Sequence, residues 1–406
     1  MKRLICLLFI FLPFGLRAQN GQIDSIRQVV DTTQLMQNEN LQIEATEALN
    51  NMYNFKFDLA EAKFQEILRR YPEHPLPYYI IGLSNWWKMM PYGEDDPRIK
   101  EHEPVFDKYM ELAIQKAEKM LDKNSEDIEA VFFLCAAHAL EARFYAENSQ
   151  EMRSLNNTRK AFHYFKKLND QKDLSPEFLF FSALFNYYAA WFKGEYPVMK
   201  PVLALFPAGD KTLGIKQLKE VSHNAFWTRT EAQYFLMRIY YNEEDNDKSA
   251  LAFSEYLAKT FPDNPYFQRT YARICYSLGN WKECREVSEN LLYKINIGMP
   301  GYEETGGRYA CFFLGRIYKA SGNLEKAKDY YKKTIAFAEK SNATSQNYYL
   351  YAVADLARMS DKEKDVATAR QYYQTVLDKA DKDNELHKEA KDYLKKTEEK
   401  KKGWFW

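Results

Sequence analysis

Turn-forming residues are scarce in this sequence, and so are the short motifs on which many enzymes depend. Glycine and proline number only 15 and 14 among 406 residues. Because these two residues punctuate the turns of strand-rich folds, their scarcity argues against a β-rich protein. The sequence has no HExxH zinc motif, no GxGxxG or Walker phosphate loop, and no GxSxG nucleophile turn. We therefore expect an all-α protein that is not an enzyme and that needs no cofactor and no metal ion.

An excess of charge of one sign and long apolar runs are missing as well. The chain has 57 lysine and arginine residues against 57 aspartate and glutamate residues. Nucleic-acid binding needs several clustered basic contacts to phosphates, so the balanced charge disfavours a nucleic-acid partner. Beyond residues 1–18, no segment approaches the roughly 20 apolar residues of a membrane-spanning helix. No transmembrane span is expected.

The first residues have the pattern of a secretory signal. Lys2 and Arg3 precede the apolar run of residues 4–14, and Ala18 is a small residue at which cleavage is expected. The apolar run is too short to cross a bilayer. We predict that residues 1–18 are a signal peptide that is removed from the mature protein.

The position of Cys6 decides between a soluble and a lipid-anchored product. Cys6 lies near the start of the apolar run, where a lipoprotein cysteine would not be. We therefore predict an exported protein in the periplasm or associated with the cell envelope. The start of the chain resembles that of exported proteins of the Bacteroidetes. The polar residues 19–39 are predicted to form a flexible segment.

Apolar and aromatic residues are abundant, and they recur in a repeat. Hydrophobic residues make up 46% of the chain, with 30 tyrosines and 27 phenylalanines. The clearest unit is CFFLGRIYKASGNLEKAKDYYKKTIAFAEK, which begins at Cys311 and resembles the tetratricopeptide repeat (TPR). The residues that carry the resemblance are Leu314, Gly315 and Tyr318 in the first helix and Ala327 and Tyr331 in the second.

Small residues recur where the two helices of such a repeat cross most closely. The first-helix positions that correspond to Gly315 are Ala48, Gly82, Cys135, Ala183, Arg238, Ala272, Gly315 and Ala357. The second-helix positions that correspond to Ala327 are Ala60, Ala113, Ala161, Gly214, Ala250, Cys284, Ala327 and Ala369. Only Arg238 is large, and the alignment there is predicted to be displaced by one or two residues.

The resemblance implies an α-solenoid, in which each helix pair buries its apolar face against the next pair. We expect about eight TPR-like helix pairs over residues 40–382 and a C-terminal capping helix with an aromatic tail over residues 383–406. The tail Trp404-Phe405-Trp406 is expected to pack on the last helix. Docking on a second copy and contact with a membrane surface are the alternatives.

Three consecutive repeats are interrupted between their two helices. The insertions are predicted at residues 88–104, 144–156 and 193–212, and the first and third contain aromatic residues, methionine and proline. A fully solvated loop would not need such residues. The insertions are therefore expected either to cover the solenoid or to form a binding surface.

The cysteines are better explained as core residues than as reactive ones. Cys135 and Cys284 occupy small-residue positions of the repeat, and Cys275 and Cys311 lie on first-helix positions that usually face inward. A disulfide between Cys275 and Cys284 remains conceivable if the geometry permits. No CxxC pair is present, so neither a zinc ribbon nor a thioredoxin-like site is indicated.

The repeat pattern favours a scaffold for protein–protein interaction. The first helices of such repeats line a concave groove that can hold a peptide or protein ligand. We predict that Tyr78, Asn85, Trp86 and His138 lie exposed or half-exposed near this binding zone. The alternative is a glycan-binding protein of an outer-membrane uptake system, in which Trp86, Trp87 and Trp191 would be the exposed platform.

Overall fold

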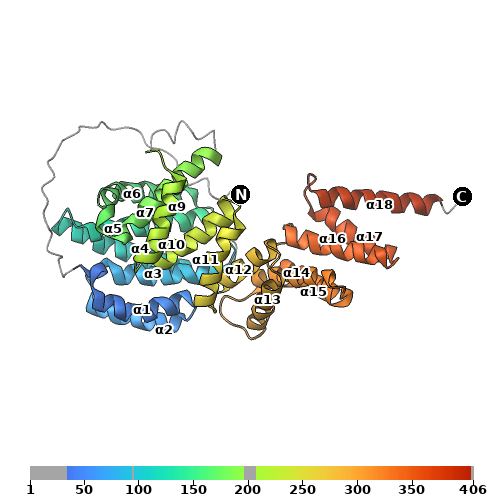
Figure 1. Cartoon of the computed structure of the whole chain (residues 1–406), viewed down its shortest axis with the longest axis horizontal. Helices are drawn as coiled ribbons and strands as arrows, with labels where there is room; N and C mark the ends of the chain where they lie inside the picture. The colour runs from blue at the N-terminus through green and yellow to red at the C-terminus, as the bar shows by residue number, and fades with distance from the viewer. Residues whose placement is uncertain (1–33, 94–95, 196–206, 404–406) are drawn as a thin grey trace. The chain divides into compact units, whose positions relative to one another are not determined.

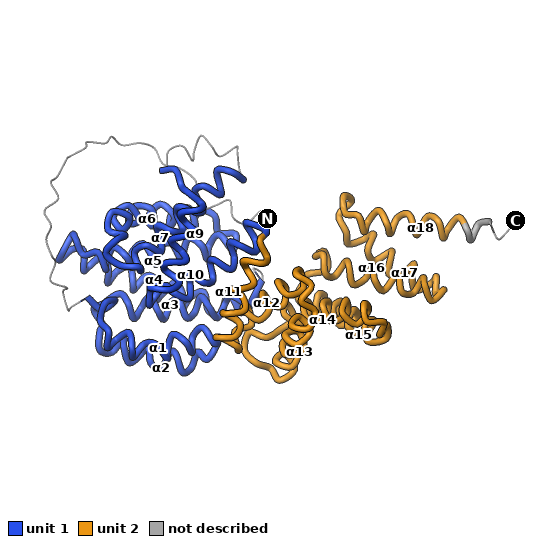
Figure 2. The backbone as a smooth tube through the Cα atoms, viewed as in Figure 1, with its two compact units in different colours: residues 1–245 blue, residues 246–406 orange. Residues whose placement is uncertain are grey.

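A computed structural model of the chain describes residues 34–93, 96–195 and 207–403. Within these ranges every regular element is a helix, and no strand occurs. The chain divides into two compact units, unit 1 over residues 1–245 and unit 2 over residues 246–406 (Figure 2). The predicted all-α fold with consecutive helix pairs is confirmed.

Several predicted features lie wholly or mainly outside the described residues. They are the signal peptide over 1–18, most of the segment 19–39, most of the insertion 193–212, and the tail Trp404-Phe405-Trp406. These assignments stay predictions.

Unit 1 is built from helices that pack in sequence order (Figure 1). Its α-helices are α1 (Glu39–Tyr53), α2 (Phe57–Arg70), α3 (Pro75–Met89), α4 (Pro97–Lys123), α5 (Ile128–Glu147), α6 (Glu151–Asp170), α7 (Pro176–Glu195), α9 (Lys211–Asn224) and α10 (Arg229–Arg238). Its other helical segments are the 3-10 turns η2 (Leu35–Gln37) and η3 (Lys172–Leu174) and the π-helical turn η5 (Ile239–Glu243). The pairs α1–α2, α3–α4, α5–α6 and α7–α9 each form one repeat.

Unit 2 continues the same pattern. Its helices are α11 (Asp247–Thr260), α12 (Pro265–Ser277), α13 (Trp281–Asn296), α14 (Glu304–Ala320), α15 (Leu324–Lys340), α16 (Asn347–Lys362), α17 (Val366–Lys379) and α18 (Glu385–Gly403). The pairs α12–α13, α14–α15 and α16–α17 are repeats, and α18 packs on α16 and α17 as the predicted capping helix. In sequence order α10 and α11 are the two helices of the remaining repeat, and the unit boundary falls between them.

The small residues mark the crossing points of paired helices, as predicted. A Cβ atom on Gly214 would lie 2.8 Å from the Ala183 carbonyl oxygen, and one on Gly315 would lie 2.6 Å from the Tyr331 ring. The Cys135 thiol contacts the Ala161 carbonyl oxygen at 3.5 Å. No larger side chain would fit at these places without separating the helices.

The exception at Arg238 has a structural cause. Arg238 is the last residue of α10, and the π-helical turn η5 begins directly after it. A π-helical turn adds one residue to the helix, so the repeat frame cannot be carried across it unchanged. Which residue of α10 lies at the crossing point, and so the size of the displacement, stays a prediction.

One tight turn joins the two helices of most repeats. In each of these turns, a backbone N–H donates a hydrogen bond to the carbonyl oxygen five residues earlier. The residue directly before the donor has a positive φ. The positive-φ residues at these turns are Phe55, Ser149, Gly279, Gly322 and Lys364. The predicted insertion 144–156 contains one of these turns, at Ser149. Its extra residues do not form a loop but lengthen α5 and α6 to 20 residues each.

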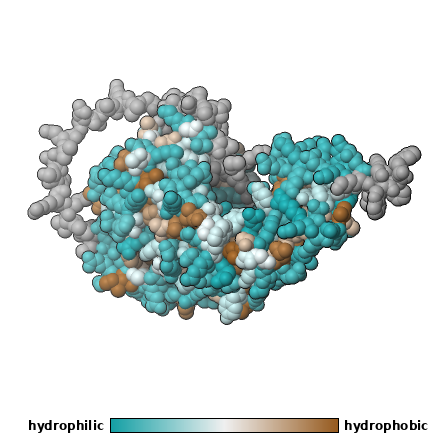
Figure 3. Space-filling model, turned by 45° about the vertical axis from the view of Figure 1, so that its right-hand side comes forward, coloured by the Kyte–Doolittle hydropathy of each residue, from teal (hydrophilic) through white to brown (hydrophobic). Residues whose placement is uncertain are grey.

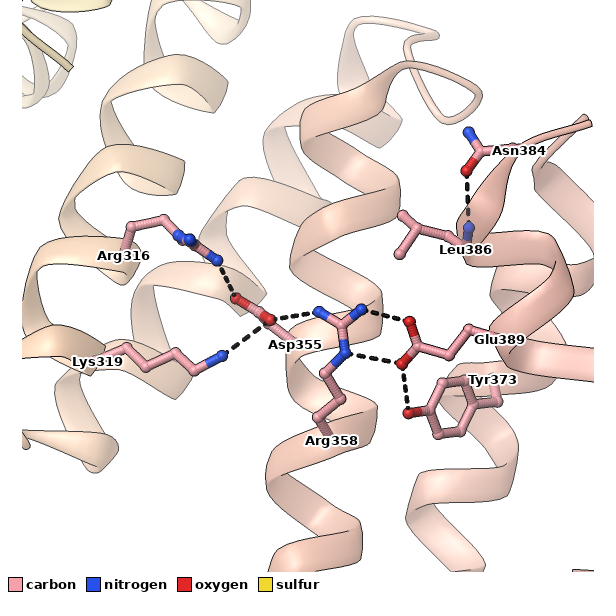
Figure 4. Close-up of polar contacts among 8 residues, drawn as sticks. All are labelled: Arg316, Lys319, Asp355, Arg358, Tyr373, Asn384, Leu386 and Glu389. Carbon is pink, nitrogen blue, oxygen red and sulfur yellow. Dashed lines mark hydrogen bonds and ion pairs between the residues drawn. The ribbon is translucent and has the colours of Figure 1, made fainter. Parts of the chain in front are cut away.

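A buried carboxylate ties together the last repeats of unit 2 (Figure 4). Asp355 of α16 is 1% exposed and lies 2.9 Å from Lys319 Nζ and 3.3 Å from Arg316 Nη1, both on α14. Arg358 contacts Asp355 at 3.0 Å and also pairs with Glu389 of α18. Burial alone would raise the pKa of Asp355, but its hydrogen bond to Lys319 and the other cations hold it below its ordinary value.

Figure 3 shows apolar side chains singly or in small groups on a mainly hydrophilic face. Among the described helices, none is long and apolar enough to cross a bilayer.

Candidate functional site

An aromatic cavity inside unit 1 is the candidate site. Its volume is about 300 Å³, and its walls come from α3, α5, α6, α7 and α10. Nine aromatic residues line it: Tyr79, Phe162, Phe165, Phe180, Phe181, Phe185, Tyr188, Phe192 and Phe235. We call it the aromatic cavity.

Small residues on α5 and α7 leave the space open. Ala136, Ala139 and Ala146 of α5 and Ala189 of α7 line the cavity together with the larger rings. Both helices are apolar over most of their circumference, because each packs against helices on several sides. The cavity therefore results from alanines at positions where a larger apolar residue would have filled the core.

Arg143 places a cation in the wall of the aromatic cavity. Its guanidinium carbon lies 4.6 Å from the Trp86 ring centroid, 5.1 Å from that of Tyr234 and 5.2 Å from that of Phe235. Such cation–π contacts stabilise a guanidinium that has lost part of its water. The Arg143 Nε also donates to Glu147 Oε1 at 3.0 Å.

The carboxylate of Glu147 pairs with two guanidinium groups at this wall, those of Arg143 and Arg238. Arg238 Nη1 lies 3.5 Å from the same Glu147 carboxylate. Burial alone would raise the pKa of Glu147, but Arg143 and Arg238 hold it below its ordinary value. Burial alone would lower the pKa of Arg143, and attraction to Glu147 and Tyr234 raises it instead. The contacts at this wall therefore favour the ionised forms of Arg143 and Glu147.

Helix α10 closes the cavity against the first two repeats. Glu231 of α10 accepts hydrogen bonds from Tyr53 Oη of α1 at 3.1 Å and from Trp87 Nε1 of α3 at 3.0 Å. The Tyr234 ring meets the Trp87 ring edge-on, with centroids 5.6 Å apart. Burial raises the pKa of Glu231 above its ordinary value. Trp87 precedes Glu231 by 144 positions in the chain, and Tyr53 precedes it by 178 positions.

The predicted exposure of three site residues is wrong. Asn85, Trp86 and His138 are all buried, with Trp86 only 1% exposed. Trp86 lies under the Arg143 guanidinium, because α10 and α5 cover the face of α3 that the repeat pattern alone would leave open. Asn85 Nδ2 donates to the Ile81 carbonyl of its own helix at 2.9 Å.

His138 and Tyr78 have local partners as well. His138 Nδ1 lies 2.9 Å from Asn157 Oδ1, inside the α5–α6 interface. Tyr78 is half-buried, and its hydroxyl donates to the Pro72 carbonyl at 2.9 Å. The structure does not bring these four residues to one surface, and their role in partner binding stays a prediction.

Sequence reasoning missed the residues that form the aromatic cavity. Arg143 was the available signal, since it is a basic residue within the apolar run of α5, next to Phe144 and Tyr145. A charged residue in such a run needs a compensating partner. One partner, Glu147, lies one helical turn further along α5 and can be identified from spacing. The ring of Tyr234 lies in another repeat and cannot.

The described cysteines are buried free thiols. All four described cysteines are buried and free, so the disulfide considered between Cys275 and Cys284 is not formed. Burial raises the pKa of Cys275 to about 11 and that of Cys284 to about 12. Among the described residues, no group of three His, Cys, Asp or Glu side chains could hold a metal ion.

Comparison with known proteins gives no family assignment. No family model and no curated protein matches the chain. Among solved structures, a human IFIT1 dimer with PPP-AAAA is similar at 16% identity and a TM-score of 0.40, over 83% of this chain and 72% of that one. The TPR domain of P58(IPK) is similar at 12% identity and a TM-score of 0.23, over 88% and 99%. The TPR-like description rests on the helix pairs and crossing points of this chain itself.

Proposed function

We propose that this chain is a non-catalytic binding scaffold, and that the aromatic cavity receives apolar side chains from one segment of a partner protein. The observation that carries the proposal is the cavity itself, about 300 Å³ with a wall of aromatic rings. Ligand pockets are typically concave, mostly apolar and of this size or larger, with a few polar groups that fix orientation. Here Arg143, Glu147 and Arg238 are those polar groups.

Burial of apolar surface supplies the affinity in this proposal. Each Leu- or Phe-sized side chain moved from water into such a cavity contributes roughly 1.5–3 kcal/mol. The cavity walls are helices, so little ordering is needed when the partner binds. A partner segment with large apolar residues is therefore favoured.

Two of the three tryptophans on which the glycan-binding alternative depends are buried. Trp86 and Trp87 are 1% and 0% exposed, so neither can stack on a sugar. Trp191 is half-buried. Protein–protein interaction is the better-supported function.

Filling the aromatic cavity tests the proposal. A photoreactive residue placed at Phe185, which lines the cavity, should crosslink to one defined apolar segment of a partner protein. Ala139→Phe should abolish this crosslink, because the added ring occupies the space that the partner needs. Ala62→Phe is the matched control, since Ala62 is exposed on α2.

The variants also separate binding from folding. Ala139→Phe should melt no earlier than the native chain, because filling a cavity removes unpaired surface. A crosslink that persists at full yield in Ala139→Phe would show that the aromatic cavity is not the binding site.

We also propose that the chain is exported to the periplasm or envelope. Support comes from Lys2, Arg3 and the apolar residues 4–14, followed by Ala18. N-terminal sequencing of the protein from its native source should give a chain that begins at Gln19. A native chain that still begins at Met1 would reject the proposal.

A further inference from the structure

A second, polar cavity lies in unit 1 beside η2. Its volume is about 170 Å³. The polar residues that line it are Gln34, Gln37, Gln42, Glu129, Ser175, Glu177 and Asn224. No lysine or arginine is among the described residues that line it. We call it the polar cavity.

Glu129 reaches the polar cavity from the first turn of α5. Its side chain is almost fully buried, and its Oε1 accepts the Met36 N–H at 2.8 Å. His74 Nε2 lies 3.3 Å from the same oxygen. Because His74 Nδ1 accepts the Leu76 N–H at 3.1 Å, a neutral His74 carries its hydrogen on Nε2, beside Oε1.

The other oxygen of Glu129 has no partner. Oε2 is buried and accepts no hydrogen bond. A buried carboxylate oxygen without a donor is costly, so such an atom indicates a missing partner. Glu129 is one of the residues that line the polar cavity, and a donor that reached Oε2 from there would supply that partner.

Glu177 shows the contrast between a structural carboxylate and an available one. Its Oε1 accepts the N–H groups of Phe226 and Trp227 at 2.6 and 2.9 Å. Its Oε2 accepts the N–H and the hydroxyl of Thr228 at 3.0 and 2.7 Å. Glu177 is therefore committed to the α9–α10 turn, whereas Glu129 retains one free acceptor.

The neighbouring chain segment is fixed in place around the polar cavity. The Met36 carbonyl accepts hydrogen bonds from Gln42 Nε2 at 2.7 Å and from Trp227 Nε1 at 3.0 Å. Met36 is thus held at both its N–H and its carbonyl group by three side chains, those of Glu129, Gln42 and Trp227. These contacts hold this part of the wall in place, so the movement that binding needs is the one that brings the buried Glu129 Oε2 within reach of a ligand.

We propose that the polar cavity binds a primary alkylammonium group, with Glu129 Oε2 as its anionic partner and the amide oxygens of the lining as further acceptors. An ammonium group carries three N–H donors on a compact centre, which suits one carboxylate oxygen surrounded by amides. A lysine side chain and a free primary amine share this chemistry. The inference is independent of the aromatic cavity and of its proposed partner.

A native methionine reports on occupancy. The full chain with ¹³C-labelled methionine methyl groups would be titrated with propylammonium chloride, and the Met36 methyl signal followed by NMR. Met36 is buried and lines the cavity, so we expect a saturable shift of that signal. 1-Propanol and tetramethylammonium chloride are the matched probes, since one lacks the charge and the other lacks N–H donors.

Two variants locate the anionic partner. Glu129→Gln keeps a carbonyl oxygen for the Met36 N–H but removes the charge, so propylammonium should bind at least about tenfold more weakly. Glu126→Gln changes an exposed carboxylate three residues earlier, in the turn that precedes α5, and should leave binding unchanged. N-acetyl-lysinamide replaces propylammonium in a further titration, and tighter binding than propylammonium would identify a protein-borne lysine as the source.

The proposal is overturned if propylammonium gives no saturable shift, or if 1-propanol or tetramethylammonium gives an equal one. It is also overturned if Glu129→Gln binds as well as the native chain. The comparison of the probes needs only the native protein, so it remains decisive if Glu129→Gln fails to fold.

Discussion

Unit 1 and unit 2 use the same repeat but differ in how far their contacts reach. In unit 2 each helix packs against the next one or the next but one, and the Asp355 network follows the same order. In unit 1, α10 also contacts α1 and α3, more than 140 residues earlier in the chain. Repeat arrays normally depend on neighbour contacts alone. The difference shows that one helix with inward-facing polar and aromatic groups can join the ends of an array.

Removing Trp87 should have the largest effect and should break the closure of unit 1. Trp87 is fully buried against Tyr53 and Tyr234, so Trp87→Ala is expected to cost about 4 kcal/mol of unfolding free energy. Hydrogen exchange should then rise in both α1 and α10. Trp281→Ala removes a tryptophan that is 53% exposed and should change little. If exchange rises only in α3 and its sequence neighbours, unit 1 does not couple its ends.

The two units should respond to pH in opposite directions. In unit 1, burial raises the pKa of Glu243 to about 7, so its stabilising contribution is present below pH 4.5 and is lost as the pH rises through 7. The loss is at most about 3 kcal/mol. Glu243→Gln should make this decline smaller when unfolding of unit 1 is followed between pH 4 and pH 8. Glu231, whose pKa burial also raises, should account for part of what remains.

The matched control lies one residue further along the chain. Glu244 pairs with Lys211 at 2.8 Å, and its pKa is lowered despite burial. Glu244→Gln should therefore leave the decline of unit 1 stability with rising pH in place. Equal pH profiles for native and Glu243→Gln chains would contradict the assignment.

Asp355→Asn should weaken unit 2 alone. It leaves Lys319, Arg316 and Arg358 without their shared carboxylate, at a cost of about 2 kcal/mol because these cations are partly exposed. Since the pKa of Asp355 is below its ordinary 3.8, its contribution is present above that pH and is lost on acidification. Exchange should rise in α14 to α18 at pH 7, and the variant should lose less stability than the native chain below pH 4. A rise confined to α16 would show that the network does not connect repeats.

The smallest effect compares two equivalent turns of unit 2. Gly322 has φ +81° with open space around it, and Lys364 has φ +66°. Gly322→Ala should cost about 1 kcal/mol from backbone strain, and Lys364→Gly should recover a similar amount. Thermal melting of both variants measures the two shifts. Shifts of the same sign would show that backbone strain does not dominate at these turns.

The sequence sufficed for features that depend on neighbouring repeats. Ala272 and Cys284 were identified as a crossing point, and the Cys284 thiol does contact the Ala272 carbonyl at 3.6 Å. The burial of Trp86 was not predictable in this way, because α10 belongs to a repeat three pairs further along the chain. The aromatic cavity was missed for the same reason. Periodicity indicates which face of a helix is apolar but not which distant helix covers it.

The rates at which the four buried thiols react can report local opening of the helices around them. Cys135 belongs to unit 1, and Cys275, Cys284 and Cys311 belong to unit 2. Burial raises the pKa of each thiol, so alkylating reagents should modify them only when the surrounding helices separate. The rate at which each cysteine is modified therefore measures how often its own repeat opens, without any introduced probe.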